Sequence, residues 1–143
     1  MGQKRITTQQ DAGAKTTEKV APQKSSKKSV DGLVLHVQST YNNTKLTLTD
    51  NGGNALLSAS SGSTGFSGAK KGTPFAAAKV GEVLGEKAVQ YGIKDLGVIV
   101  KGVGSGRESA IRGFISKGFN ISYIKDVTPV PFNGPKPKKP RRV

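Results

Sequence analysis

The feature that most constrains the fold is a strand, loop and helix signature in the second half of the chain. The continuous apolar run Leu96–Val100 is followed by a glycine-rich segment, 101–106, and then by residues typical of a helix start. A run of this kind predicts a central strand covered on both faces. The alternating segment Phe119–Lys125 predicts another strand, joined to the first by a right-handed crossover. We therefore expect an α/β layered domain.

The first half of the chain predicts three further strands. Apolar and polar residues alternate in Leu33–Ser39 and Lys45–Thr49, the period of half-buried strands. Asn54–Ser60 is a third strand, joined to the second through the turn residues 50–53. These segments predict a three-stranded antiparallel meander.

Two helices complete the expected domain. Thr73 and Pro74 suit the cap and first position of a helix that runs to about Tyr91, and a second helix is expected to end at Gly118. Gly81 and Gly85 each cost roughly 0.5–1 kcal/mol inside a helix, which indicates close packing against the sheet. The order β-β-β-α-β-α-β predicts a single α/β domain, residues 31–130, with a mixed five-stranded sheet packed with helices.

The charge distribution indicates a polyanionic partner. The chain has 23 Lys and Arg against 9 Asp and Glu, a net charge of +14. Residues 1–30 hold seven basic and two acidic side chains, residues 31–130 eleven and seven, and residues 131–143 five and none. The N-terminal extension 1–30 and the Pro-rich tail 131–143 are thus predicted to be basic arms, disordered when free. Clustered charge of this kind is typical of nucleic-acid binding.

The first candidate binding element is the glycine loop that precedes the second helix. Its glycines and cations are Lys101, Gly102, Gly104, Gly106, Arg107 and Arg112. Glycines allow close approach to a phosphate, and a helix N-terminus presents free N–H groups to it. Ser105 and Glu108 fit a capping box, which places the helix start at Ser105. Arg107 then lies in the first turn, where the helix dipole disfavours a cation, so we expect a negative group to compensate it.

A second cationic glycine loop, Ser60–Gly72, precedes the first helix and carries Lys70 and Lys71. Phe66 in this loop either stacks on an unpaired base or anchors the loop locally. Between the first two strands, Asn42 and Asn43 offer amide groups suited to ribose and base edges, although such a pair also occurs in ordinary turns. Together the loops predict one binding surface.

Two enzymatic or nucleotide-binding alternatives remain. The strand, Gly-x-Gly and helix order with Asp126 downstream resembles a dinucleotide site, but Arg107 stands where the third glycine belongs. A metal-dependent nuclease would have to use Asp50, Glu82, Asp95 and Asp126, each of which also has a structural explanation. His36 is the only histidine and there is no cysteine, so we expect no catalytic triad, no thiol chemistry, no metal and no cofactor.

These segments resemble a known family, in order along the chain. The matching segments are Ser39–Thr44, Ser61–Phe66, Lys70–Ala77, Lys101–Arg112, Lys125–Gly134 and Pro137–Val143. Over roughly residues 32–143 the chain resembles the universal family of small-subunit ribosomal protein eleven, of the bacterial or organellar type.

The resemblance implies a non-enzymatic constituent of the small ribosomal subunit. It implies binding of ribosomal RNA on the platform, bridging of RNA helices, and a place along the cleft where messenger RNA leaves. The implied neighbours are the seventh and eighteenth small-subunit proteins, with initiation factor three and messenger RNA nearby. No apolar run reaches the roughly 20 residues that span a bilayer, so we expect no membrane partner. The resemblance implies a cytoplasmic ribosome, with an organellar ribosome as the alternative. The implied fold is similar to ribonuclease H.

The predicted RNA-binding residues combine both loops, the Asn pair and the tail. They are Asn42, Asn43, Lys45, Phe66, Lys70, Lys71, Lys101, Gly102, Gly104, Gly106, Arg107, Arg112, Asn133, Lys136, Lys138, Lys139, Arg141 and Arg142. Three residues depart from the family pattern: Val103 replaces a common proline, Phe132 a histidine and Pro135 a frequent cysteine. Asn133 precedes a glycine that leaves the next N–H unshielded, so it is the candidate isoaspartate site.

Overall fold

The computed structural model describes residues 32–92 and 94–140, so the N-terminal extension 1–30, Arg141 and Arg142 lie outside the described residues. The elements follow the predicted order. They are β1 (Leu33–Ser39), β2 (Thr44–Thr49), β3 (Ala55–Ser60), the 3-10 helix η1 (Gly68–Gly72), α1 (Pro74–Val89), β4 (Asp95–Lys101), α2 (Arg107–Ile115) and β5 (Asn120–Asp126). The predicted α/β domain with a mixed five-stranded sheet is confirmed.

The sheet has the strand order β3-β2-β1-β4-β5. β1, β2 and β3 form the predicted antiparallel meander, whereas β4 is parallel to both β1 and β5. The turn between β2 and β3 is closed by Asp50, whose carboxylate accepts from the backbone and side-chain N–H groups of Asn54, both at 2.9 Å. Turn chemistry and strand period therefore determine this half of the sheet.

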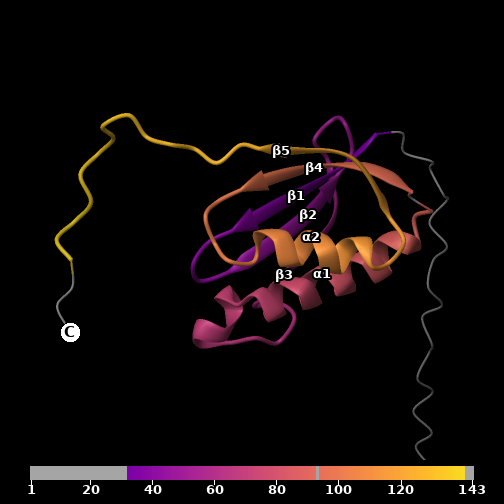
Figure 1. Ribbon diagram of the computed structural model, residues 1–143, viewed down its shortest axis with the longest axis horizontal. Coiled ribbons are helices and arrows are strands. Elements are labelled where there is room, and N and C mark those ends of the chain that lie inside the picture. Colours follow the sequence, from indigo (N-terminus) through magenta and orange to yellow (C-terminus); the bar gives the residue numbers. More distant parts are fainter. Residues whose placement is uncertain (1–31, 93, 141–143) are drawn as a thin grey trace, which may run out of the picture.

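Both helices cover the same face of the sheet, as Figure 1 shows. Leu35 of β1, Leu46 of β2 and Val98 of β4 are fully buried beneath them. The prediction that β4 is covered on both faces is wrong. Leu96, Val98 and Val100 face the helices, while between the exposed ends of β4 the opposite face carries Gly97, which Tyr123 covers, and the half-buried Ile99. The apolar run looks continuous because a glycine and a partly exposed isoleucine occupy the outer positions.

The helices pack against each other through glycine. A Cβ at Gly81 of α1 would lie 2.4 Å from the carbonyl oxygen of Ala110, and one at Gly113 of α2 would lie 2.3 Å from that of Ala78. The expectation that Gly81 and Gly85 pack against the sheet is therefore wrong, because both face α2. Gly85 meets the side chain of Lys117 from the turn that follows α2.

Beyond β5 the chain leaves the domain. Residues 127–140 contain no helix or strand, and residues 129–140 are exposed. Figure 1 shows this segment running away from the sheet. Among the described residues, no helix has the length and apolar character needed to cross a bilayer.

Candidate nucleic-acid interface

The connecting loops gather at one edge of the sheet. Because β1, β4 and β5 are parallel, they end at the same edge, and both α-helices begin there (Figure 1). We call this region the loop edge, defined by residues 40–43, 61–73 and 102–106 with the strand and helix ends that flank them. In open α/β sheets, ligands bind outside the carboxyl ends of parallel strands. The topology thus places both predicted glycine loops in the position where such folds bind ligands.

Glycines pack the loop edge by letting backbone segments approach one another. A Cβ at Gly72 would lie 2.1 Å from the carbonyl oxygen of Tyr41, and one at Gly104 would lie 2.3 Å from that of Thr40. Gly102, with φ of 104°, fits equally closely against Ser39. The turn between β1 and β2 is therefore held between the two helix-opening loops. The glycines that the sequence assigned to phosphate approach also have this packing role.

The start of α2 differs from the predicted capping box. The helix begins at Arg107 with Gly106 as its cap, and no side chain of the described residues makes a cap hydrogen bond. The hydroxyl of Ser105 instead donates to the carbonyl oxygen of Gly72 at 2.9 Å and so joins the two loops. Glu108 forms an ion pair with Arg112 one turn along the helix. The capping prediction is wrong because both of its side chains have other partners.

The negative group expected beside Arg107 comes from the chain itself. Arg107 Nη2 forms an ion pair with the carboxylate of Asp126, at the end of β5, and Nη1 donates to the carbonyl oxygen of Gly102 at 2.6 Å. Thr128 donates to the same carboxylate through its hydroxyl at 2.6 Å and its backbone N–H at 2.9 Å. The Thr128 hydroxyl also accepts from the Gly102 N–H at 3.1 Å.

We call these four residues, Gly102, Arg107, Asp126 and Thr128, the tail clamp. The Thr128 hydroxyl and the Arg107 guanidinium lower the pKa of Asp126 from 3.8 to about 2. The clamp fixes the point at which the tail leaves β5, and it leaves the Arg107 side chain about one-third exposed. The sequence contained a signal for it, because Asp followed two residues later by Thr is a common side-chain-to-backbone turn.

Lysines give the loop edge its uncompensated charge. Lys70 and Lys71 lie in η1, Lys45 is the second residue of β2 and Lys101 ends β4. Within residues 32–92 and 94–140, none of the four takes part in an ion pair. The two acidic residues near this edge, Glu108 and Asp126, are both paired with arginine. The loop edge therefore carries net positive charge that nothing in the described chain neutralises.

The start of α1 is capped as predicted. The Thr73 hydroxyl accepts from the backbone N–H of Ala76 at 3.3 Å, and Pro74 occupies the first helical position. Phe66 lies edge-on to the exposed Phe75, with 6.0 Å between ring centroids and 85° between ring planes. This contact supports the local-anchor interpretation of Phe66, and one edge of the aromatic pair stays open to solvent.

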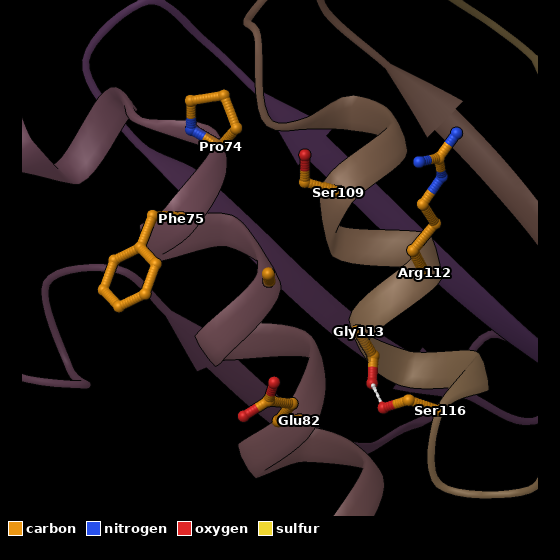
Figure 2. A pocket seen from close by; sticks show the side chains of 8 residues that line it. Pro74, Phe75, Glu82, Ser109, Arg112, Gly113 and Ser116 are labelled. Carbon is orange, nitrogen blue, oxygen red and sulfur yellow. Dashed lines mark hydrogen bonds between the residues drawn. The ribbon is translucent and has the colours of Figure 1, made fainter.

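Arg112 lies apart from the loop edge, on the outer surface of the helices. It lines an open groove of about 450 Å³ between α1 and α2, with Phe75 and Glu82 on one side and Ser109 and Ser116 on the other. Figure 2 shows these side chains along the two helices. The predicted tail cations Lys136, Lys138 and Lys139 are exposed and extend away from the domain, so the structure does not bring them to the loops.

The carboxylates considered for nuclease chemistry are dispersed. Asp50 closes a turn, Glu82 pairs with Lys79 at 2.8 Å and Asp126 belongs to the tail clamp. In the described part of the chain, no three His, Cys, Asp or Glu side chains lie close enough together to hold a metal ion. His36 shares a hydrogen bond with the Thr49 hydroxyl at 3.2 Å. The carboxylate of Asp126 is bound by Arg107 and Thr128. It is therefore not free to bind a ribose, as the dinucleotide interpretation requires.

Comparison with known proteins identifies similar chains along almost the whole described region. A family model for ribosomal protein S11 matches residues 33–142. Small ribosomal subunit protein uS11 of Hydrogenovibrio crunogenus is 52% identical over 120 residues, which cover 84% of this chain and 93% of the relative. Its namesake in Cellvibrio japonicus is 51% identical over 130 residues, covering 91% and 99%. That of Thermotoga maritima is 52% identical over 120 residues, covering 84% and 92%.

Proposed function

This chain belongs to the ribosomal protein S11 family, and on that basis we propose that it binds small-subunit ribosomal RNA through the loop edge and the C-terminal tail. As a family member it is a structural, non-enzymatic component of the small ribosomal subunit and serves translation. Its partners are ribosomal RNA and other ribosomal proteins. The proposal concerns where on the chain that RNA is held.

The observation that carries the proposal is a set of lysines on three neighbouring segments that form no ion pair within the described residues. Lys70 and Lys71 precede α1, Lys101 precedes the loop that opens α2, and Lys45 follows the turn between β1 and β2. Both helix N-termini add partial positive charge at the same edge. Phosphates that contact this edge release counterions, which is the main source of affinity for nucleic acids.

The tail extends the same interface. The exposed segment that starts at the tail clamp contains three lysines, each next to a proline: Lys136, Lys138 and Lys139. A segment of this composition needs no core of its own. It can therefore pass between two RNA helices while the loop edge contacts another part of the RNA. We propose that Arg107 contributes by fixing the direction of the tail rather than as a free phosphate ligand, since Asp126 already neutralises it.

The family resemblance supports a finer assignment. In this proposal the chain lies on the platform of the small subunit, bridges RNA helices and lines the messenger RNA exit cleft, where the Shine-Dalgarno pairing is held. Its neighbours are the seventh and eighteenth small-subunit proteins, with initiation factor three and messenger RNA nearby. The ribosome is cytoplasmic, with an organellar ribosome as the alternative.

Matched lysine pairs test the location of the interface. Lys70→Ala with Lys71→Ala removes two charges from the loop edge, whereas Lys87→Ala with Lys94→Ala removes two exposed charges from the opposite end. Binding to a small-subunit ribosomal RNA transcript is measured as a function of salt. Each lost phosphate contact reduces the slope of log K against log salt by about 0.7–0.9.

We expect the loop-edge pair to reduce the slope by about 1.4–1.8 and the distal pair to leave it almost unchanged. The two variants have the same net charge, so a general electrostatic effect would weaken both equally. Equal slopes for the two variants would therefore contradict the proposed interface. Thermal denaturation of each variant checks that the domain stays folded.

A further inference from the structure

The turn between β1 and β2 contains one polar atom without a partner. Asn43 Oδ1 is shielded from solvent and accepts no hydrogen bond; among the described residues it is the one such buried side-chain atom. An unmet buried acceptor costs about 1–3 kcal/mol. The backbone of Asn43 is fully used, because its N–H donates to the Thr40 hydroxyl at 3.1 Å and its carbonyl oxygen accepts from the Thr40 N–H at 2.8 Å. The side chain is therefore the group that remains unsatisfied.

A small polar cavity lies beside this side chain. It has a volume of about 120 Å³ and is lined by Gln38, Thr40, Asn43 and Lys45. Rotation about the last side-chain bond of Asn43 is soft, so its Oδ1 can turn toward a donor inside the cavity. The Thr40 hydroxyl is already engaged with Asn43, donating to its carbonyl oxygen at 3.1 Å and accepting from its N–H. The cavity thus offers an acceptor and a cation.

Two lysines flank the cavity on the open face of the sheet. Gln38 is opposite Lys45 in the antiparallel pair and opposite Lys101 in the parallel pair. Neither lysine has an acidic partner in the part of the chain that the structure describes. A ligand that fits must bring a hydrogen-bond donor for Asn43 and negative charge, within a few ångströms, for the lysines.

A ribonucleotide unit meets both requirements. Its 2′-hydroxyl is a single projecting donor, and the phosphates lie on either side of the sugar. A base edge is less suitable, because a bidentate contact needs both the oxygen and the nitrogen of the amide exposed side by side. The 2′-hydroxyl is also the group by which proteins distinguish RNA from DNA.

We propose that Asn43 accepts a hydrogen bond from a ribose 2′-hydroxyl of the bound RNA while Lys45 and Lys101 contact the adjoining phosphates. This inference rests on the proposed function, because it assigns one ribose to the loop edge. It makes Asn43 a residue that selects ribose over deoxyribose, distinct from the lysines, whose contacts are independent of the sugar.

Nucleotide-analogue interference tests the assignment. The full chain is bound to a small-subunit ribosomal RNA transcript that carries sparse 2′-deoxy substitutions, and bound and free RNA are compared position by position. Asn43→Ala removes the acceptor, Asn43→Asp keeps an acceptor, and Gln90→Ala is the control because Gln90 is an exposed amide at the C-terminal end of α1, outside the loop edge. Thermal denaturation verifies that each variant folds.

For the wild-type chain we expect 2′-deoxy interference at one or more positions. One of these disappears in Asn43→Ala and persists in Asn43→Asp and Gln90→Ala. The affinity of Asn43→Ala for the unmodified transcript falls about 2- to 10-fold, as expected for one hydrogen bond. Identical interference patterns for wild type and Asn43→Ala would overturn the inference while leaving RNA binding intact. Failure of the wild-type chain to bind the transcript would overturn the proposed function, and the inference with it.

Discussion

Replacing Gly81 by alanine tests how closely the two helices are held together. The new Cβ would lie 2.4 Å from the carbonyl oxygen of Ala110 and 2.8 Å from the backbone nitrogen of Phe114. Both atoms belong to the backbone of α2, so no side chain can rotate away. Reaching ordinary van der Waals contact requires α2 to move by about 1 Å.

The expected loss of stability follows from two opposing contributions. Overpacking of a filled interior costs about 1–3 kcal/mol. Alanine in place of glycine inside a helix returns about 0.5–1 kcal/mol. The difference between these contributions lowers the free energy of unfolding by about 1.3 kcal/mol at its midpoint, with an upper limit of about 2.5 kcal/mol. For a domain of this size the midpoint corresponds to a decrease in Tm of roughly 5–10 °C.

Gly85→Ala is the matched control. Its Cβ would meet the Cγ of Lys117 at 2.8 Å and the Cβ of Lys117 at 3.1 Å. The Cγ can swing aside at the cost of the exposed ion pair with Glu86, and the Cβ needs a shift of only a few tenths of an ångström. A surface pair of this kind contributes about 0–1 kcal/mol, which the gain in helix propensity offsets. Thermal denaturation by circular dichroism should therefore show a lower Tm for Gly81→Ala and a nearly unchanged Tm for Gly85→Ala. A rise in Tm for Gly81→Ala would refute the described contact between the helices.

The remaining predictions concern the tail clamp and the tail. Because the pKa of Asp126 is lowered from 3.8 to about 2 in the folded protein, its stabilising contribution is present above about pH 4 and is lost as pH falls toward 2. The difference in Tm between wild type and Asp126→Asn should shrink over that pH range. A constant difference would contradict the clamp. Arg107→Asp and Asp126→Arg should each lower Tm and weaken RNA binding, while the double variant, with its charges exchanged, should recover both; a double variant that folds but still binds weakly would indicate a direct phosphate contact by Arg107. Deletion of residues 131–143 should leave Tm unchanged and abolish incorporation into reconstituted small subunits, and normal incorporation would refute the role of the tail. Asn133 is exposed, has φ of 51° and precedes Gly134. A peptide-based isoaspartate assay after ageing should therefore detect isomerisation that Gly134→Ala suppresses. Equal amounts of isoaspartate in both chains would show that the following glycine is not the cause.

Local pattern predicted the elements and their order, whereas contacts between distant segments could not be predicted. Strand alternation, the Thr73 and Pro74 helix start and the β2–β3 turn are properties of a few consecutive residues, and the structure reproduces them. The partner of Gly81 depends on the crossing of two helices, which no local pattern encodes. For the same reason, the apolar run of β4 predicts two covered faces. A local run does not reveal that both helices lie on one side of the sheet.

The candidate site shows the same division. Both glycine loops were found from composition, and topology brings them to one edge together with the Asn42 and Asn43 turn. The ion pair between Arg107 and Asp126 joins residues 19 positions apart. Sequence reasoning required an anion beside Arg107 but could not choose between a bound phosphate and a distant carboxylate. The unsatisfied acceptor of Asn43 likewise emerges only once its surroundings are known.

Crosslinking within reconstituted small subunits tests the central claim most directly. The full chain is assembled with ribosomal RNA and the remaining subunit proteins, irradiated, and digested, and the crosslinked residues are identified by mass spectrometry. We expect RNA crosslinks at Lys45, Lys70, Lys71 and Lys101 and in the tail, with none at Lys87 or Lys94. Crosslinks concentrated at Lys87 and Lys94, with the loop edge unmodified, would contradict the account.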